Sequence, residues 1–487
     1  MLAIASTFLY ALLSGRVMLV NVPQEQEGLF CEPFPGTSWV LPDGFPEGNP
    51  MKLYAGAPES YVNMLKNNVI QYDTPASSLP AHVYLHLEQI GQRLSDNIFC
   101  DDDQRLLGKF GWMILKSDSY FAMGLFLTPM YDKELARMFP YKEAVFHHLG
   151  RYLLHPTNRV WGIVRRYYEA YLAGVDEKIG FQIRIFPERP VKFENMYDQL
   201  TRCIKEQRLL PELGKAEPAA NASGDGKVKA VLIVSLYSGY YDKIRGMYYE
   251  NPTKTGEIVA VYQPSHQEKQ ESASNEHNQK ALAEIYLLSY CDKIATSTWS
   301  TFGYVAYGFA GVKPWILLRP DWDKEMSDVV CVRSTSVEPC LHSPPILGCR
   351  AREEVDVARV KPYVRHCEDV RDLGLIQIHG VHSGASIIFE VMASTDDVAS
   401  SRVNSTLKES CGIEDRLATL LKENPQLIRI KFFVDLPTKE ATPKEGVNPL
   451  PLTPATTIPD DACSSTETEI PTISDSMFTG FTDYQSD

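Results

Sequence analysis

The chain has 487 residues, which exceeds the usual size of one domain and predicts about two. Its 48 Lys and Arg against 62 Asp and Glu give a formal net charge of -14, which argues against a non-specific nucleic-acid binder, because such proteins need a basic surface. A hydrophobic fraction of 44% excludes a wholly disordered chain.

The chain opens on an apolar run, residues 2–13. No basic segment precedes the run and no small-residue cleavage site follows it, so it does not resemble a signal peptide. Its length is also below the ~20 residues that cross a bilayer. Ser14, Gly15 and Arg16 are typical of a helix end, and residues 17–22 then predict a strand. We therefore expect a core helix and strand, and an upstream segment missing before them.

Strands and helices are predicted to alternate through the second part of the chain. Asn158 can cap a helix, and the expected strands that follow are 179–186, 230–235, 257–262 and 293–296. Helices are expected between them, around 194–209, 240–250 and 280–290, with another from about 301. Since strands rich in β-branched residues alternating with helices are typical of a covered parallel sheet, residues 178–320 predict a doubly wound α/β domain.

Two segments of this predicted domain carry polar groups at strand ends, where ligands of such sheets bind. Arg184 lies among apolar residues, so it either faces an anion or forms a structural ion pair. Residues 295–304 place a run of hydroxyls between a strand and a helix. The run suits phosphate at a helix N-terminus, or else caps only its own helix.

The ten cysteines include no C-x-x-C pair, so a zinc or thioredoxin-like site is not supported. Four of them lie within one loop-rich stretch, which fits either local disulfides in an oxidising compartment or buried thiols. These four are Cys331, Cys340, Cys349 and Cys367.

Seven ordered segments resemble the plant xyloglucan and arabinogalactan α-1,2-fucosyltransferases. They are ASTFLYALL (from residue 5), LFCEPFPGTSW (29), HPTNRVWGIVRRYYEAYL (155), IGFQIRIF (179), HNQKALAEIYLLS (277), TSTWSTFGYVAYGFAGVKPWIL (296) and EPCLHSPP (338). The resemblance implies a GT-B-like α/β fold, with two Rossmann-like doubly wound domains facing a cleft. It implies transfer of L-fucose from GDP-fucose to a galactose 2-hydroxyl with inversion, without a metal or other cofactor. It also implies a type II enzyme of the Golgi stack membrane that acts in cell wall biogenesis. A homodimer is compatible with the resemblance.

The resemblance also implies roles for individual residues. Arg184 matches the arginine that the family uses on the donor phosphate, where leaving-group charge develops. The expected remaining donor contacts are Ser297, Thr298, Ser300, Thr301, Phe302 and Gly303. Asp118 follows an apolar run and matches an acidic residue of the family, so it is either the base that assists the acceptor hydroxyl or a structural N-cap.

Two acidic segments have the D-x-D spacing of metal-dependent glycosyltransferases, namely 101–103 and 321–323. Because acidic triplets near Gly, Asn or Pro are usually solvated turns, we expect neither to hold a metal.

We expect four parts along the chain. These are an acceptor-side domain at 1–177 that is incomplete at its start, a GDP-fucose-binding domain at 178–375, an appendage without assigned role at 376–446, and an acidic, Thr/Ser/Pro-rich disordered tail at 447–487. An active fucosyltransferase, with GDP-fucose and a galactose-containing glycan as partners, is the leading hypothesis. The alternatives are a fucosyltransferase-like protein that binds nucleotide sugar or glycan without turnover, and an interaction protein with a degenerate catalytic body.

Overall fold

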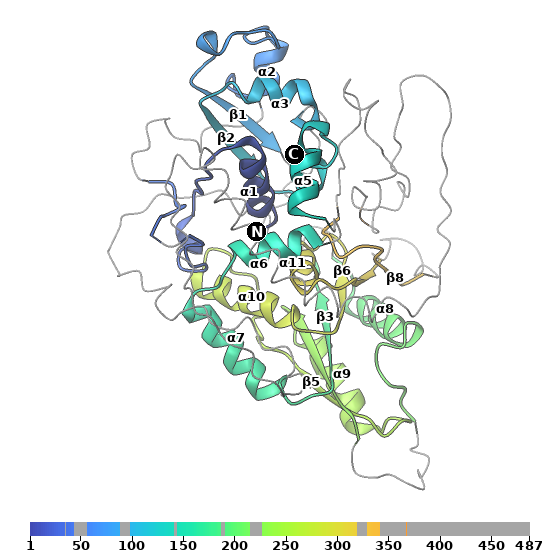
Figure 1. The fold of residues 1–487 in the computed structure, drawn as a ribbon. Helices are drawn as coiled ribbons and strands as arrows, with labels where there is room; N and C mark the ends of the chain where they lie inside the picture. The colour runs from blue at the N-terminus through green and yellow to red at the C-terminus, as the bar shows by residue number, and fades with distance from the viewer. Residues whose placement is uncertain are drawn as a thin grey trace, which may run out of the picture.

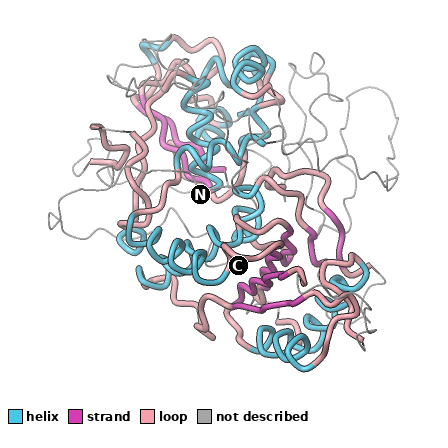
Figure 2. Tube along the Cα trace, turned by 60° about the horizontal axis from the view of Figure 1, so that its bottom comes forward, coloured by secondary structure: helices cyan, strands magenta, loops and turns pink. Residues whose placement is uncertain are grey.

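A computed structural model describes residues 1–34, 36–42, 56–87, 98–140, 144–186, 190–214, 226–318, 329–340 and 367. These residues form helices and two separate groups of strands, as Figures 1 and 2 show. In chain order the main elements are α1 (Leu2–Ser14), α2 (Tyr61–Lys66), β1 (His82–Leu87), α3 (Asp101–Leu107), β2 (Trp112–Ser117), α4 (Ala122–Leu125), α5 (Asp132–Met138), α6 (Val145–Leu153), α7 (Asn158–Tyr171), β3 (Glu177–Ile183), α8 (Phe193–Glu206), β4 (Val228–Ser235), α9 (Gly239–Glu250), β5 (Ile258–Tyr262), α10 (Asn275–Leu288), β6 (Lys293–Ser297), α11 (Thr301–Ala310), β7 (Trp315–Leu317) and β8 (Cys331–Arg333).

The larger sheet has six strands in the order β5-β4-β3-β6-β7-β8. All neighbours are parallel except β8, which pairs antiparallel with β7. The chain winds outward from β3 to β4 and β5, and then returns to the other side of β3 to form β6. This is the doubly wound arrangement predicted for residues 178–320, and its winding direction reverses between β3 and β6.

Helices cover both faces of the larger sheet. Leu200 of α8 and Ile244 of α9 are buried in one apolar cluster with Ile233 of β4. On the opposite face, Leu288 of α10 and Val305 of α11 belong to a second cluster. Burial on both faces explains why these strands are continuous runs of β-branched and apolar residues rather than alternating ones.

The N-terminal part is built around the parallel pair β1 and β2. As predicted, α1 is a core helix, and Gly15 ends it in the left-handed conformation with φ of 65°. The strand expected at 17–22 is wrong: only Val20 makes a bridge, to Val40, while Val17 is 41% exposed. Within the described ranges, no helix is both long and apolar enough to span a membrane.

One apolar cluster runs from the N-terminal helices into the helices on the larger sheet. Phe146 of α6 and Phe309 of α11 stack with ring centroids 5.6 Å apart, and both are fully buried. Helix α7, which the sequence assigned to the first domain, packs on α10. Figure 1 shows α6, α10 and α11 between the N-terminal elements and the larger sheet. The N-terminal half, built around β1 and β2, and the C-terminal half, built around the larger sheet, therefore share a hydrophobic core.

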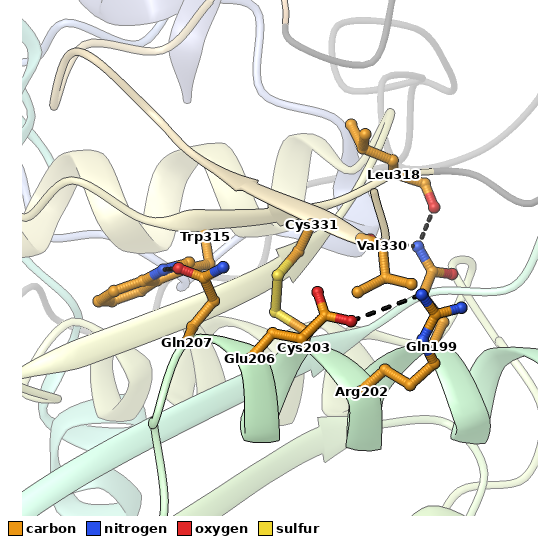
Figure 3. The surroundings of a disulfide bond; sticks show 9 residues. All are labelled: Gln199, Arg202, Cys203, Glu206, Gln207, Trp315, Leu318, Val330 and Cys331. Carbon is orange, nitrogen blue, oxygen red and sulfur yellow. Dashed lines mark hydrogen bonds and ion pairs between the residues drawn. A yellow bond between two sulfur atoms is a disulfide. The ribbon is translucent and has the colours of Figure 1, made fainter. Parts of the chain in front are cut away.

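Disulfide bonds join Cys203 to Cys331 and Cys340 to Cys367. The second bond is local, as predicted, but the first is not, because Cys331 pairs with a cysteine 128 residues earlier. Figure 3 shows this bond tying α8 to β8, with Gln199 of α8 donating hydrogen bonds to the carbonyls of Leu318 and Val330. Cys349 and the parts expected at 376–446 and 447–487 lie outside the described residues.

Candidate functional site

The carboxyl ends of β3 and β6 meet at the point where the winding of the larger sheet reverses. Arg184 is the first residue after β3, and Ser297 is the last residue of β6. The backbone N–H of Arg184 donates to Ser297 Oγ at 3.0 Å. The two segments that the sequence selected independently are thus brought together, at the edge where ligands of doubly wound sheets bind.

The Arg184 side chain is half-buried, and its Cζ lies 5.2 Å from the ring centroid of Phe186. Its charge also acts on His277, in the first turn of α10. Burial lowers the pKa of His277, and the charges of Lys280 and Arg184 lower it further, while Glu271 opposes them. The neutral form of His277 is therefore favoured. No sequence pattern pointed to His277, because it lies on a separate helix.

The hydroxyl run between β6 and α11 divides into two groups. Thr296 Oγ1 donates to Gln182 Oε1 at 2.6 Å, and Ser297 Oγ accepts from Arg184, so these two hydroxyls link β6 to β3. Thr298 and Ser300 are buried, at 5% and 3% exposure, in the turn that leads into α11. The first group is structural, and the second lies at the start of the helix.

Ser300 occupies the N-cap of α11, but its side chain makes no capping hydrogen bond. Of the two alternatives given for these hydroxyls, capping of their own helix is therefore not met by Ser300. Thr301 and Phe302 follow as half-buried first residues of α11. In the turn before them, Trp299 has a left-handed φ of 58°, and its N–H donates to the Tyr304 hydroxyl at 3.1 Å. The turn is thus held by the Tyr304 hydroxyl of α11 rather than by a capping hydrogen bond from Ser300.

Gly303 lets α11 approach the sheet closely. A Cβ at this position would lie 1.8 Å from Thr296 Oγ1 and 3.0 Å from Gln182 Oε1. The close approach that the structure shows is therefore between the helix and the strand ends. It sets the first turn of α11 directly beside the ends of β3 and β6.

Asp118 is the residue that follows β2, as the sequence indicated. The structural alternative given for it was an N-cap, and this is wrong, because the next helix, α4, has Phe121 as its N-cap. The turn around Asp118 is tied down by Ser119, whose N–H donates to Ser117 Oγ at 3.1 Å and whose hydroxyl donates to the Leu87 carbonyl at 3.3 Å. Asp118 is thus held in a strand-end turn of the N-terminal part.

The acidic segment 101–103 is not a solvated turn, which corrects the prediction. It forms the first turn of α3, and Asp103 is only 3% exposed. Asp103 Oδ1 accepts hydrogen bonds from the hydroxyls of Tyr61 at 2.6 Å and Tyr72 at 3.1 Å. Across the described residues, no group of three or more His, Cys, Asp or Glu is arranged to hold a metal, and segment 321–323 lies outside them.

The family of this chain follows from a sequence match that covers most of it. A family model described as Xyloglucan fucosyltransferase matches residues 1–350. The chain belongs to this family. The xyloglucan fucosyltransferase resemblance is thereby confirmed, together with an α/β fold containing a parallel sheet.

Relatives in the xyloglucan fucosyltransferase family are close in sequence. Galactoside 2-alpha-L-fucosyltransferase of Arabidopsis thaliana is 48% identical over 370 residues, which is 76% of this chain and 65% of the relative. The Pisum sativum protein of the same name is 47% identical, over the same shares. This chain thus spans 65% of the length of both relatives.

A solved structure has a similar fold. It is that of a mutant of Arabidopsis thaliana FUT1 in complex with GDP, and it matches with a TM-score of 0.66 and 47% sequence identity. The match covers 76% of this chain and 78% of that chain.

Proposed function

We propose that this chain transfers L-fucose from GDP-fucose to the 2-hydroxyl of a galactose on a cell-wall glycan, with inversion at the sugar carbon. The observation that carries the proposal is the meeting of Arg184 with Ser297, at the end of the strand that leads into α11, at the switch point of the larger sheet. The names of its relatives, and the GDP bound in the related solved structure, support the donor and the reaction.

The donor site needs positive potential because negative charge develops on the β-phosphate as the sugar–phosphate bond breaks. We propose that the Arg184 guanidinium stabilises this negative charge on the β-phosphate. The first backbone N–H groups of α11 supply oriented dipoles beside it, and Thr298, Ser300 and Thr301 supply hydroxyls. Neutral His277 adds no second cation, so the cationic charge that we assign to the phosphate is that of Arg184. We expect this arrangement to work without a metal or other cofactor.

The acceptor hydroxyl must lose its proton as it attacks the sugar carbon. We assign Asp118 as the general base, acting directly or through one water. Its place in a tethered turn after β2 supports this role, because a base works only when its carboxylate is held in position. The donor and acceptor groups would then come from the larger and smaller sheets respectively, as in a GT-B enzyme with a cleft between its domains.

Replacing Arg184 tests the donor site. Arg184→Ala should weaken GDP binding by roughly 10- to 100-fold, since one charge-assisted contact contributes about 1.5–3 kcal/mol. Isothermal titration calorimetry with GDP measures this. Arg202→Ala is the matched control, because Arg202 pairs with Glu206 on the outer helix α8 and should leave GDP binding unchanged. Equal GDP affinity of Arg184→Ala and the unmodified chain would refute the phosphate assignment.

Fucose transfer to a galactosylated xyloglucan oligosaccharide tests the reaction itself. Appearance of a fucosylated product supports the proposed activity, and tight GDP binding with no product supports the non-catalytic alternative.

We also propose that the protein acts in the Golgi stack. The disulfides support this, because they form and persist in oxidising compartments such as the secretory pathway. Imaging of a tagged chain against a Golgi marker measures its location, and a cytosolic signal would contradict the proposal.

A further inference from the structure

A carboxylate is buried where the two halves of the molecule meet. Glu338 follows β8 and is 1% exposed. The sequence placed it in the segment EPCLHSPP but gave it no role. An ionised carboxylate is costly to bury unless hydrogen-bond donors surround it. The hydrogen bonds of Glu338 therefore indicate its role.

Two donors to the Glu338 carboxylate come from the N-terminal half. The Tyr120 hydroxyl donates to Oε2 at 2.5 Å, and the backbone N–H of Phe146 lies 3.2 Å from both carboxylate oxygens. Burial raises the pKa of the Tyr120 hydroxyl, and the negative charge of Glu338 raises it further, so this hydroxyl stays protonated and remains a donor.

The backbone of Glu338 is anchored in the C-terminal half. Its carbonyl accepts from the hydroxyl of Tyr307, on α11, at 3.5 Å. Its N–H donates to Ser336 Oγ at 3.0 Å. Glu338 therefore connects the helix that begins at the donor site with the segment that follows β2.

The side chain bound by Glu338 lies two residues after Asp118. On the other side of the same segment, Ser6 Oγ of α1 accepts from the N–H groups of Phe121 and Ala122, both at 3.1 Å. The Asp118 turn is thus fixed to α1 on one side and to Glu338 on the other. Through the Tyr307 hydroxyl, the Glu338 contact ties this turn to α11.

We propose that Glu338 is a positioning residue that, through Tyr120, holds the Asp118 turn at a fixed place relative to the donor-binding end of α11. Asp118 then meets the acceptor hydroxyl at the required distance from the sugar carbon. Small displacements of a base cost large factors in rate. This inference rests on the proposed function, since it gives Glu338 a part in the same reaction.

Tyr120→Phe is the mildest test, because it removes the hydroxyl and keeps the ring. It should lower kcat for fucose transfer by about tenfold, with the KM for GDP-fucose and the Kd for GDP within about twofold of the unmodified chain. Tyr248→Phe is the matched control: Tyr248 donates to the Pro211 carbonyl at 3.0 Å, away from Asp118. A merely structural role for Glu338 would give the two variants the same kcat, and that result overturns the proposal.

Glu338→Gln extends the test, because it removes the charge and keeps the shape. It should lower kcat at least as much as Tyr120→Phe, again with GDP affinity retained. Loss of GDP affinity in parallel with kcat would overturn the proposal. If the unmodified chain binds GDP but transfers no fucose, the proposed function fails first, and this outcome is distinct from normal turnover by Tyr120→Phe.

Amide hydrogen exchange gives a reading that does not need turnover. The peptide covering residues 117–122 should exchange faster in Tyr120→Phe than in the unmodified chain or in Tyr248→Phe. Unchanged exchange in that peptide would show that Glu338 does not hold the turn, and would also overturn the proposal.

Discussion

A helix that covers the larger sheet contains a buried ionisable residue, Glu284, which the helical spacing of apolar residues does not reveal. Glu284 lies in α10, and Ser265 Oγ donates to its Oε1 at 2.5 Å. Burial raises the pKa of this carboxyl from 4.5 to about 7, while the Ser265 hydrogen bond lowers it. Because the folded-state pKa lies above the unfolded one, the folded chain loses stability as the pH rises from about 4.5 to about 7.

Glu284→Gln should remove this pH dependence. The variant should be more stable than the unmodified chain at about pH 8, by roughly 1–3 kcal/mol, and the difference should shrink towards about pH 5. Urea denaturation at both pH values measures it. Glu276→Gln is the control, because its side chain is 69% exposed on the same helix. A gain that does not depend on pH would contradict the assignment of the raised pKa to Glu284.

The candidate site could be predicted in part at this scale. Arg184 and Ser297 could be predicted from the sequence because both lie at the ends of β-branched runs, and parallel strands end at one edge of a sheet. The role of Glu338 could not be predicted, because its partner Tyr120 is 218 residues away in the sequence and the tertiary fold brings the two together. His277 was missed for the same reason.

Strands of the larger sheet were predicted well from their β-branched runs. The four strands expected in residues 178–320 occur as β3, β4, β5 and β6. Most residues of β3, β4 and β6 are buried, as in a sheet covered on both sides, while β5 lies at the sheet edge with Ile258 57% exposed. The strand expected at 17–22 fails although it is equally apolar. A strand needs a neighbour along its length, and within the described part of the chain the β-bridge in this segment is that of Val20 to Val40.

Gly303→Ala tests the packing of α11 on the sheet. The added Cβ would collide with Thr296 Oγ1, so we expect a loss of roughly 1–3 kcal/mol in the free energy of unfolding. Gly246→Ala on α9 is the matched control, because a Cβ there comes no closer than 3.9 Å to the Glu250 side chain. The control should be neutral or stabilising by up to about 1 kcal/mol. Equal melting temperatures of the two variants would contradict the close approach.

At the scale of the whole molecule, the bond between Cys203 and Cys331 closes a long loop that contains β4 to β7. The double variant Cys203→Ser, Cys331→Ser should lose roughly 2–5 kcal/mol of stability. The pair Cys340 and Cys367 is the comparison, since its sequence separation is 27 rather than 128. In the chain-entropy account its removal costs about 1 kcal/mol less. Chemical denaturation of both double variants measures the difference, and a larger loss for the shorter loop would contradict the loop-entropy explanation.

The apolar cluster shared by the two halves decides how this protein can be divided in the laboratory. A fragment that stops before β3 would leave the face of α6 around Phe146 uncovered, and a fragment that starts at β3 would uncover Phe309 and its neighbours on α11. Large exposed apolar patches cause association and aggregation. The larger sheet is therefore best produced and studied together with the N-terminal part, as one expressed protein.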